Sequence, residues 1–233
     1  MEKIIALLIF VCIAFGLFAQ EADSLFLAAD QSLMTMPTAY TMPKGSNSLT
    51  SYEVLLLQYA YAISDRSHFS IGMVFPISTD MLRTTTLGTK INYLKYKKTQ
   101  AAVSLSYIPD AQVAALGNVI SIGSTRGSVH LMINRGQSLD GGGGGFIFGL
   151  GGIKTFSTRV SGMLEFYNFS DILDIDYSDD EEDDLTDMNE SVLLFGIRFK
   201  GEKMSWDLGG IRPLVVDDGD LLAIPFVKGT FIF

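Results

Sequence analysis

Histidine is the side chain best suited to acid–base chemistry near neutral pH, and the chain has two, His68 and His130. A histidine that activates a nucleophile needs a hydroxyl or thiol within hydrogen-bond reach and a further group that orients its ring. Neither histidine stands in a recognisable motif of this kind. We therefore expect both to be polar lumen or interface residues, and we predict that the chain is not an enzyme and has no catalytic residue.

The second group that could do chemistry is a run of carboxylates, which suits hard cations such as Ca²⁺. Residues 170–190 contain eleven acids and no base. They are Asp171, Asp174, Asp176, Asp179, Asp180, Glu181, Glu182, Asp183, Asp184, Asp187 and Glu190. Removing these eleven charges from the formal net charge of −9 leaves +2 for the rest of the chain. The run lacks the glycine of an EF-hand, so we expect no specific metal site and no cofactor, only a solvated loop or loosely bound divalent cations.

The sequence lacks the residues that other kinds of functional site require. The only cysteine, Cys12, lies in an apolar N-terminal run, so the mature chain would have neither a thiolate nor a disulfide. The five glycines at 141–145 are followed by Phe146 rather than by Lys and Ser or Thr, which does not match a phosphate-binding loop. No basic patch with interleaved aromatic residues occurs, so we predict that nucleic acid is not a partner.

An excess of apolar residues limits the secondary structure that the chain can form. Hydrophobic residues make up 48% of the chain, and the mean hydropathy is +0.29. After Met1, Glu2 and Lys3, residues 4–18 are almost all apolar, and Leu17 and Ala19 stand at suitable −3 and −1 positions. This layout predicts a secretory signal at 1–19. The alternative is an N-terminal anchor, but the run is shorter than the ~20 residues of a spanning helix.

The remaining apolar residues fall in short segments with a period of two. Because only helices and closed barrels satisfy their backbone in lipid, we predict an all-β fold at 33–233, a transmembrane antiparallel up-and-down β-barrel. It has about 12 strands, with 10 or 8 as alternatives, and both termini are periplasmic, with residues 20–32 as a periplasmic segment. A soluble lipocalin-like barrel is the other possible fold. The predicted strands cover residues 33–42, 49–63, 68–77, 85–96, 100–108, 114–123, 128–134, 144–156, 159–169, 191–200, 203–212 and 221–233.

Alternation within these segments predicts which side chains face the lumen. Phe195, Ile197 and Phe199 share a face opposite Arg198 and Lys200, and we expect the apolar face to meet lipid. The same pattern places six titratable side chains in the lumen. They are Lys90, His130, Glu165, Arg198, Asp207 and Lys228. Small residues share the inward face, so the lumen could be a modest channel or a pocket for the N-terminal segment.

Connection lengths predict the orientation, because barrels of this type have short periplasmic turns and longer outer loops. With the last strand ending in the periplasm, residues 43–48 and the acidic run at 170–190 become outer loops. Basic residues gather at the predicted periplasmic turns. They are Arg66, Lys97, Lys98, Arg126, Arg159, Lys200 and Lys203. Acidic residues gather at the opposite end, which agrees with an assignment that made no use of charge.

The C-terminal residues Val227, Gly229, Phe231 and Phe233 alternate along one face and end in an aromatic residue. This pattern resembles the β-signal of bacterial outer-membrane proteins, which implies recognition by the barrel assembly machinery, although Gly229 stands where a larger residue is usual. Residues 36–46, 58–66 and 69–72 resemble the start of small uncharacterised barrels of Bacteroidota type, over about the first 80 residues. That resemblance implies no particular activity.

These patterns together predict an outer-membrane barrel that acts as a narrow pore or small-solute transporter of unknown substrate. The alternative is a structural or surface-interaction barrel with a closed lumen, whose acidic loop binds cations or partners. An outer-membrane lipid-modifying enzyme is a third possibility. The expected partners are outer-membrane lipid, lipopolysaccharide and the barrel assembly machinery.

Overall fold

The computed structural model describes residues 31–75, 79–124, 126–170, 191–214 and 223–233. These residues form twelve strands and one short 3-10 helix, η1 (Thr79–Thr84). The strands are β1 (Asn47–Tyr52), β2 (Leu56–Ser64), β3 (Ser67–Val74), β4 (Thr86–Tyr96), β5 (Thr99–Ile108), β6 (Val113–Ser124), β7 (Gly127–Ser138), β8 (Gly144–Ser157), β9 (Val160–Ser170), β10 (Ser191–Lys200), β11 (Met204–Pro213) and β12 (Ile224–Ile232). Across the described ranges, no helix has the length and apolar character needed to cross a membrane.

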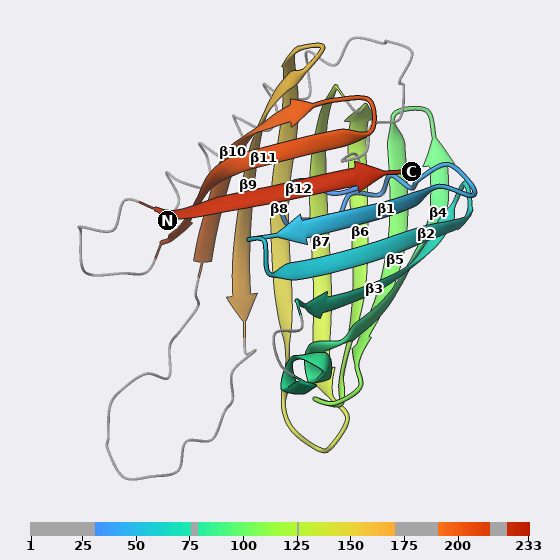
Figure 1. The fold of residues 1–233 in the computed structure, drawn as a ribbon, viewed down its shortest axis with the longest axis vertical. Coiled ribbons are helices and arrows are strands. Elements are labelled where there is room, and N and C mark those ends of the chain that lie inside the picture. Colours follow the sequence, from blue (N-terminus) through green and yellow to red (C-terminus); the bar gives the residue numbers. More distant parts are fainter. Residues whose placement is uncertain (1–30, 76–78, 125, 171–190, 215–222) are drawn as a thin grey trace.

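The strands form one closed barrel (Figure 1). Each strand pairs antiparallel with its neighbours in the sequence, and β1 pairs with β12 to close the sheet, from Ser48 opposite Ile232 to Tyr52 opposite Lys228. Closure leaves no edge strand, because each of the twelve strands is paired on both sides. The predicted 12-strand antiparallel up-and-down barrel is therefore confirmed, and this architecture is compatible with an outer-membrane barrel protein.

The two ends of the barrel differ in their connections. One end, which we call the short-turn end, carries the C-terminal Phe233 and the β2–β3, β4–β5, β6–β7, β8–β9 and β10–β11 connections, each no more than three residues long. The other, the long-loop end, carries the remaining connections, including residues 109–112 and 139–143. β9 ends and β10 begins at this end, and the residues between them, 171–190, lie outside the described residues.

Side chains alternate along the strands as the sequence predicts, with apolar groups outside and polar groups inside. On β10, Phe195, Ile197 and Phe199 are 41%, 46% and 46% exposed, whereas Arg198 and Lys200 are buried. The same holds on β3, where Phe69 is exposed and His68 and Ser70 are buried. The period of two comes directly from the pleat of a strand, so this feature needs no information about distant parts of the chain.

The first predicted strand, at 33–42, is wrong: this segment forms no named strand, and only Ser32 and Pro37 make an isolated bridge. The segment carries prolines at Pro37 and Pro43, which lack the N–H that a ladder position in a sheet requires. Its backbone groups are satisfied instead by side chains that point inward from the barrel wall.

The second predicted strand, at 49–63, is in fact two strands, β1 and β2, which meet at residues 53–55. Glu53 and Val54 have φ of 49° and 67° there, a left-handed conformation that β-branched residues rarely adopt. No Asn-Gly or Asp-Gly pair marks this turn, and the four consecutive apolar residues at 54–57 give no sign of a break. The two errors cancel in the strand count.

The predicted outer loop at residues 43–48 is also wrong. These residues lie at the short-turn end, where the Lys44 N–H donates to Asp65 (2.8 Å).

Candidate functional site

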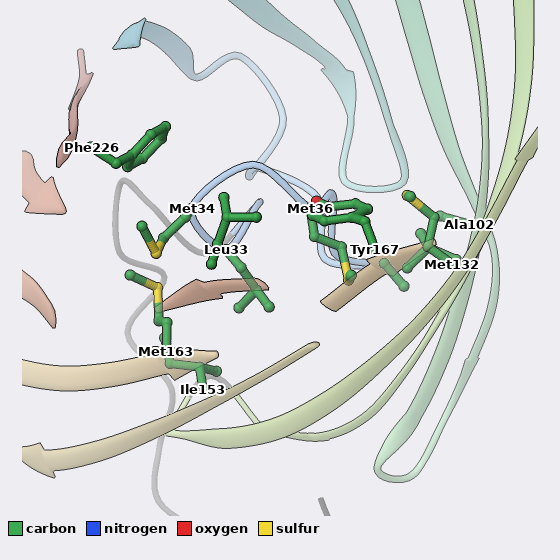
Figure 2. Packing of buried hydrophobic residues seen from close by; sticks show 12 residues of the cluster. Leu33, Met34, Met36, Ala102, Met132, Ile153, Met163, Tyr167 and Phe226 are labelled. Atoms are coloured by element: carbon green, nitrogen blue, oxygen red, sulfur yellow. The ribbon is translucent and has the colours of Figure 1, made fainter. Parts of the chain in front are cut away.

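Residues 31–42, which we call the plug, fill part of the barrel lumen (Figure 2), and the chain that follows them reaches the short-turn end at Lys44. The plug starts with a small hairpin, in which backbone hydrogen bonds join Gln31 to Thr38 (3.1 Å) and Leu33 to Met36 (2.8 Å). The four residues at its tip, 33–36, all have bend conformation and belong to no helix or strand. The apolar side chains of the plug are almost completely buried.

Glu165 on β9 holds the tip of the hairpin. Its carboxylate accepts the backbone N–H groups of Met34, Thr35 (3.2 Å) and Met36 (3.1 Å), and also the Thr35 hydroxyl (2.8 Å). The Tyr167 hydroxyl donates to the same carboxylate (3.1 Å). Glu165 is fully buried, and a buried carboxylate is tolerated only when such donors replace its water.

A buried charge cluster on β10, β11 and β12 holds the other side of the tip. Arg198 donates in a bidentate manner to Asp207 (2.7 and 2.8 Å) and also to the carbonyls of Ser32 and Leu33 (2.9 Å each). Lys228 lies 3.5 Å from Asp207 and donates to the Ser32 hydroxyl (2.8 Å) and the Leu33 carbonyl. Each wall side chain is about 1% exposed, so the plug carbonyls help to solvate the two buried cations.

Lys90 on β4 bonds to both arms of the hairpin. Its ammonium donates to the carbonyls of Gln31 and Thr38, at 3.0 Å each. The Gln31 side-chain amide also donates to the Ser48 hydroxyl on β1 (3.1 Å). Since β4 lies opposite β10 in the ring of twelve strands, Lys90 and Arg198 hold the hairpin from two sides of the lumen.

The plug continues past a polar group on β4, β6 and β7. Asn92 donates to the Ala39 carbonyl (2.7 Å), and the Ala39 N–H donates to the Ser121 hydroxyl (2.8 Å). Ser121 in turn contacts His130 Nδ1 (2.7 Å), and Ser128 contacts His130 Nε2 (2.9 Å). Ser121 and His130 lie between the plug and the barrel wall, and both side chains are completely buried. They therefore support the plug.

The wall is shaped to the plug's apolar side chains. A Cβ atom built on any of four inward-facing glycines would lie no more than 2.8 Å from an atom of Leu33, Met34 or Met36, closer than real contacts allow. These are Gly149, Gly151, Gly196 and Gly209. Figure 2 shows the three plug side chains among wall residues such as Met132 and Met163. The wall therefore has recesses that plug side chains occupy, although at Gly196 and Gly209 the backbone of the paired strand approaches at least as closely.

The structure places all six titratable side chains predicted for the lumen inside the barrel, and each is at most 5% exposed. Five of them contact the plug or one another directly, and His130 reaches it through Ser121 and by an edge-on contact with the Tyr40 ring. His68 is also buried. In the described part of the chain, no three His, Cys, Asp or Glu side chains gather into a metal site. The predicted cation-binding acids at 171–190 lie outside the described residues.

The predicted assembly signal lies on the outward face of β12. Val227, Gly229, Phe231 and Phe233 alternate there with inward-facing residues, and the two phenylalanine rings stack at 5.6 Å. The Trp206 indole covers Gly229, because a Cβ atom at that position would meet the ring at 3.0 Å. The glycine that departs from the usual signal is thus matched to a cross-strand aromatic side chain. Recognition by an assembly machinery stays a prediction.

The sequence reasoning missed that the plug itself is the centre of the site. It also missed Asn92, whose side chain is 2% exposed and bonds to the plug backbone. Pro37 and Pro43 were the available signal, because two prolines in ten residues argue against a ladder strand. The partners of the plug could not be predicted, since they come from strands 50 to 200 residues away in the sequence.

No known family model matches the chain, and no curated protein matches it either. The resemblance of the N-terminal part to small Bacteroidota barrels thus remains an expectation. The function has to be argued from the site alone.

Proposed function

We propose that the chain is an outer-membrane protein of a Gram-negative-type bacterium, exported by the signal at 1–19. The inside-out distribution of side chains supports this. Leu116 and Leu131 are each 57% exposed on the outer face, whereas Glu165 and Arg198 are buried inside. A soluble lipocalin-like barrel would need the opposite arrangement, because exposed apolar belts associate in water. Outer-membrane lipid and lipopolysaccharide would surround this belt.

The proposed orientation puts the short-turn end in the periplasm, as connection lengths in bacterial barrels favour. Bases outnumber acids there, since Asp65 and Glu202 are the acids of these turns. The bases in or directly beside the turns are Arg66, Lys97, Lys98, Arg126, Arg159 and Lys203. The plug would then enter from the periplasmic side, and the assembly machinery would read β12 from that side.

Within the membrane, the proposed function is that of a narrow pore or small-solute transporter whose lumen the plug closes. The observation that carries this proposal is the fit between the four wall glycines and the plug side chains. A barrel built only as a scaffold could close its lumen with large inward side chains of its own. Here a separable segment does so, held by hydrogen bonds and apolar contacts without any covalent cross-link to the wall. Its departure would leave a passage lined by small and charged side chains.

Planar-bilayer conductance of the purified full-length mature protein tests the proposal. The variant L33D/M36D puts carboxylates into the apolar recesses and is expected to expel the plug, because an unpaired buried carboxylate is strongly unfavourable. We expect rare or no openings for the wild type and stable conductance for this variant. Heat-modifiability on a detergent gel confirms that both are folded. A folded L33D/M36D barrel that does not conduct would favour the closed-barrel alternative.

A reversible lock provides the matched control. The Ala39 N–H donates to the Ser121 hydroxyl (2.8 Å), so this plug residue and this wall residue are adjacent and offer the pair A39C/S121C for a cross-linking trial. The chain has no other cysteine beyond Cys12 in the proposed signal. In the L33D/M36D background, oxidised A39C/S121C should suppress the conductance and a reductant should restore it, whereas A39C alone in that background should not respond to either reagent.

A further inference from the structure

The wall recognises the plug mainly through its main chain. Glu165 accepts three backbone N–H groups, and Arg198 and Lys90 each donate to two backbone carbonyls. Asn92 and Ser121 bind the carbonyl and the N–H of one residue further on. Main-chain groups are common to every peptide. A site that reads them tolerates many sequences, as in other modes of peptide recognition.

The apolar side chains that enter the wall recesses lie at the tip of the hairpin. Leu33, Met34 and Met36 enter the glycine recesses, and their side chains are at most 1% exposed. Long, flexible apolar side chains, methionine above all, suit recesses of irregular shape. At this tip only the Thr35 hydroxyl makes a polar side-chain contact, to Glu165 and Tyr167. The site therefore selects a neutral peptide bend with three long apolar side chains.

We infer that the lumen is a peptide-binding site and that the plug is a tethered ligand, which a separate peptide of the same chemistry can replace. The inference rests on the proposed function, because the plug must be able to leave. The ligand class is short, uncharged peptides that form a bend. The four residues of this bend are apolar, apolar, polar and apolar in order, as in residues 33–36. Tethering gives the plug an effective concentration in the millimolar range, so an intact plug disfavours exchange.

The test uses the full-length mature L33D/M36D protein in detergent and a fluorescent, end-capped peptide with the sequence of residues 31–42. The expected result is saturable binding by fluorescence anisotropy, together with block of the open channel by the same peptide. A control peptide carrying L33D/M36D should bind at least tenfold more weakly. The exchanges T38S and T41S should change affinity less than threefold, because Lys90 binds the Thr38 carbonyl and serine keeps the hydroxyl that Thr41 donates to the Asp65 carbonyl (2.7 Å).

Two wall variants in the same background locate the binding. G151V fills the recess of Leu33 and should abolish peptide binding, whereas G152V on the outward face, where the nearest atom would be 3.5 Å away, should not. Wild-type protein with its plug in place should bind the peptide at least a hundredfold more weakly. If L33D/M36D does not give the folded gel band, L33G/M34G/M36G removes the same anchors without adding charge.

The outcomes separate the two proposals. A variant that conducts but binds neither peptide, or binds both equally, overturns the peptide site and leaves the pore intact. A folded variant that does not conduct overturns the pore, whatever the peptide does. Binding that persists with G151V would also contradict the inference, because the peptide would then lie elsewhere on the barrel.

Discussion

A Cβ atom on Gly151 would lie 2.6 Å from Cδ1 of Leu33, so any larger residue here would force the Leu33 side chain out of its present position. G151V should therefore loosen or expel the plug and raise the open probability in bilayers. Overpacking of this kind costs about 1–3 kcal/mol of unfolding free energy. The neighbouring G152V is the control, since its side chain would point outward into ordinary contact distance. Equal open probabilities of G151V and G152V in bilayers would contradict the packing argument.

The buried cluster around Asp207 should show an ordered series of stability losses. D207N leaves both Arg198 and Lys228 without a carboxylate, whereas R198Q leaves Asp207 paired with Lys228 at 3.5 Å. Breaking a buried pair from one side costs about 3–5 kcal/mol, so both variants should unfold earlier in urea, D207N the more so. The exposed Arg83–Asp110 pair, with side chains 68% and 57% exposed, supplies the control. R83Q should change stability by about 0–1 kcal/mol.

An opened pore should prefer anions. The buried charged residues of the described chain are four bases and two acids, which leave an excess of two positive charges. They are Lys90, Arg198, Lys200, Lys228, Glu165 and Asp207. Charge of one sign in a narrow low-dielectric passage concentrates the opposite ion. The reversal potential of L33G/M34G/M36G in a KCl gradient should thus report anion selectivity.

Adding K90E to that opened variant should remove most of the selectivity, because it balances the buried charges. K203E changes the same charge beside a turn at the short-turn end, where the side chain is exposed, and should have a smaller effect. Cation selectivity in the opened variant would show that the interior charges do not govern permeation.

Trp206 and Gly229 should be energetically coupled, because the indole lies where a larger side chain at Gly229 would stand. G229V and W206A should each lower the yield of the folded, heat-modifiable band. In W206A/G229V the valine would occupy the space of the lost ring, so the loss should be smaller than the two single losses added together. Simple additivity in urea unfolding would mean that the two residues act independently.

The backbone conformation of Val54 should be strained, and a glycine at this position should relieve the strain. Its φ of 67° costs an L-amino acid with a branched side chain roughly 1–2 kcal/mol, which glycine does not incur. V54G should raise the unfolding free energy by up to this amount. L55G, at a neighbouring position without positive φ, should lower it or leave it unchanged. A loss of stability in V54G would point to an apolar contact of Val54 that outweighs the strain.

The sequence alone determined which faces of the strands meet the lumen and the outside. Side chains alternate with a fixed period of two in any strand, so Arg198 between Ile197 and Phe199 already shows its direction. The closed barrel followed from the same local pattern. The number of strands came out right only because a false strand at 33–42 offset the unrecognised turn at 53–55.

Tertiary structure alone decided that residues 31–42 fill the lumen. The backbone of this segment bonds to Lys90, Glu165 and Arg198, which lie far along the chain, so no local pattern could indicate where its polar groups would be satisfied. The role of the wall glycines was hidden for the same reason. A glycine in a strand can mark a bulge, a close approach or a recess, and only the neighbouring side chains show which.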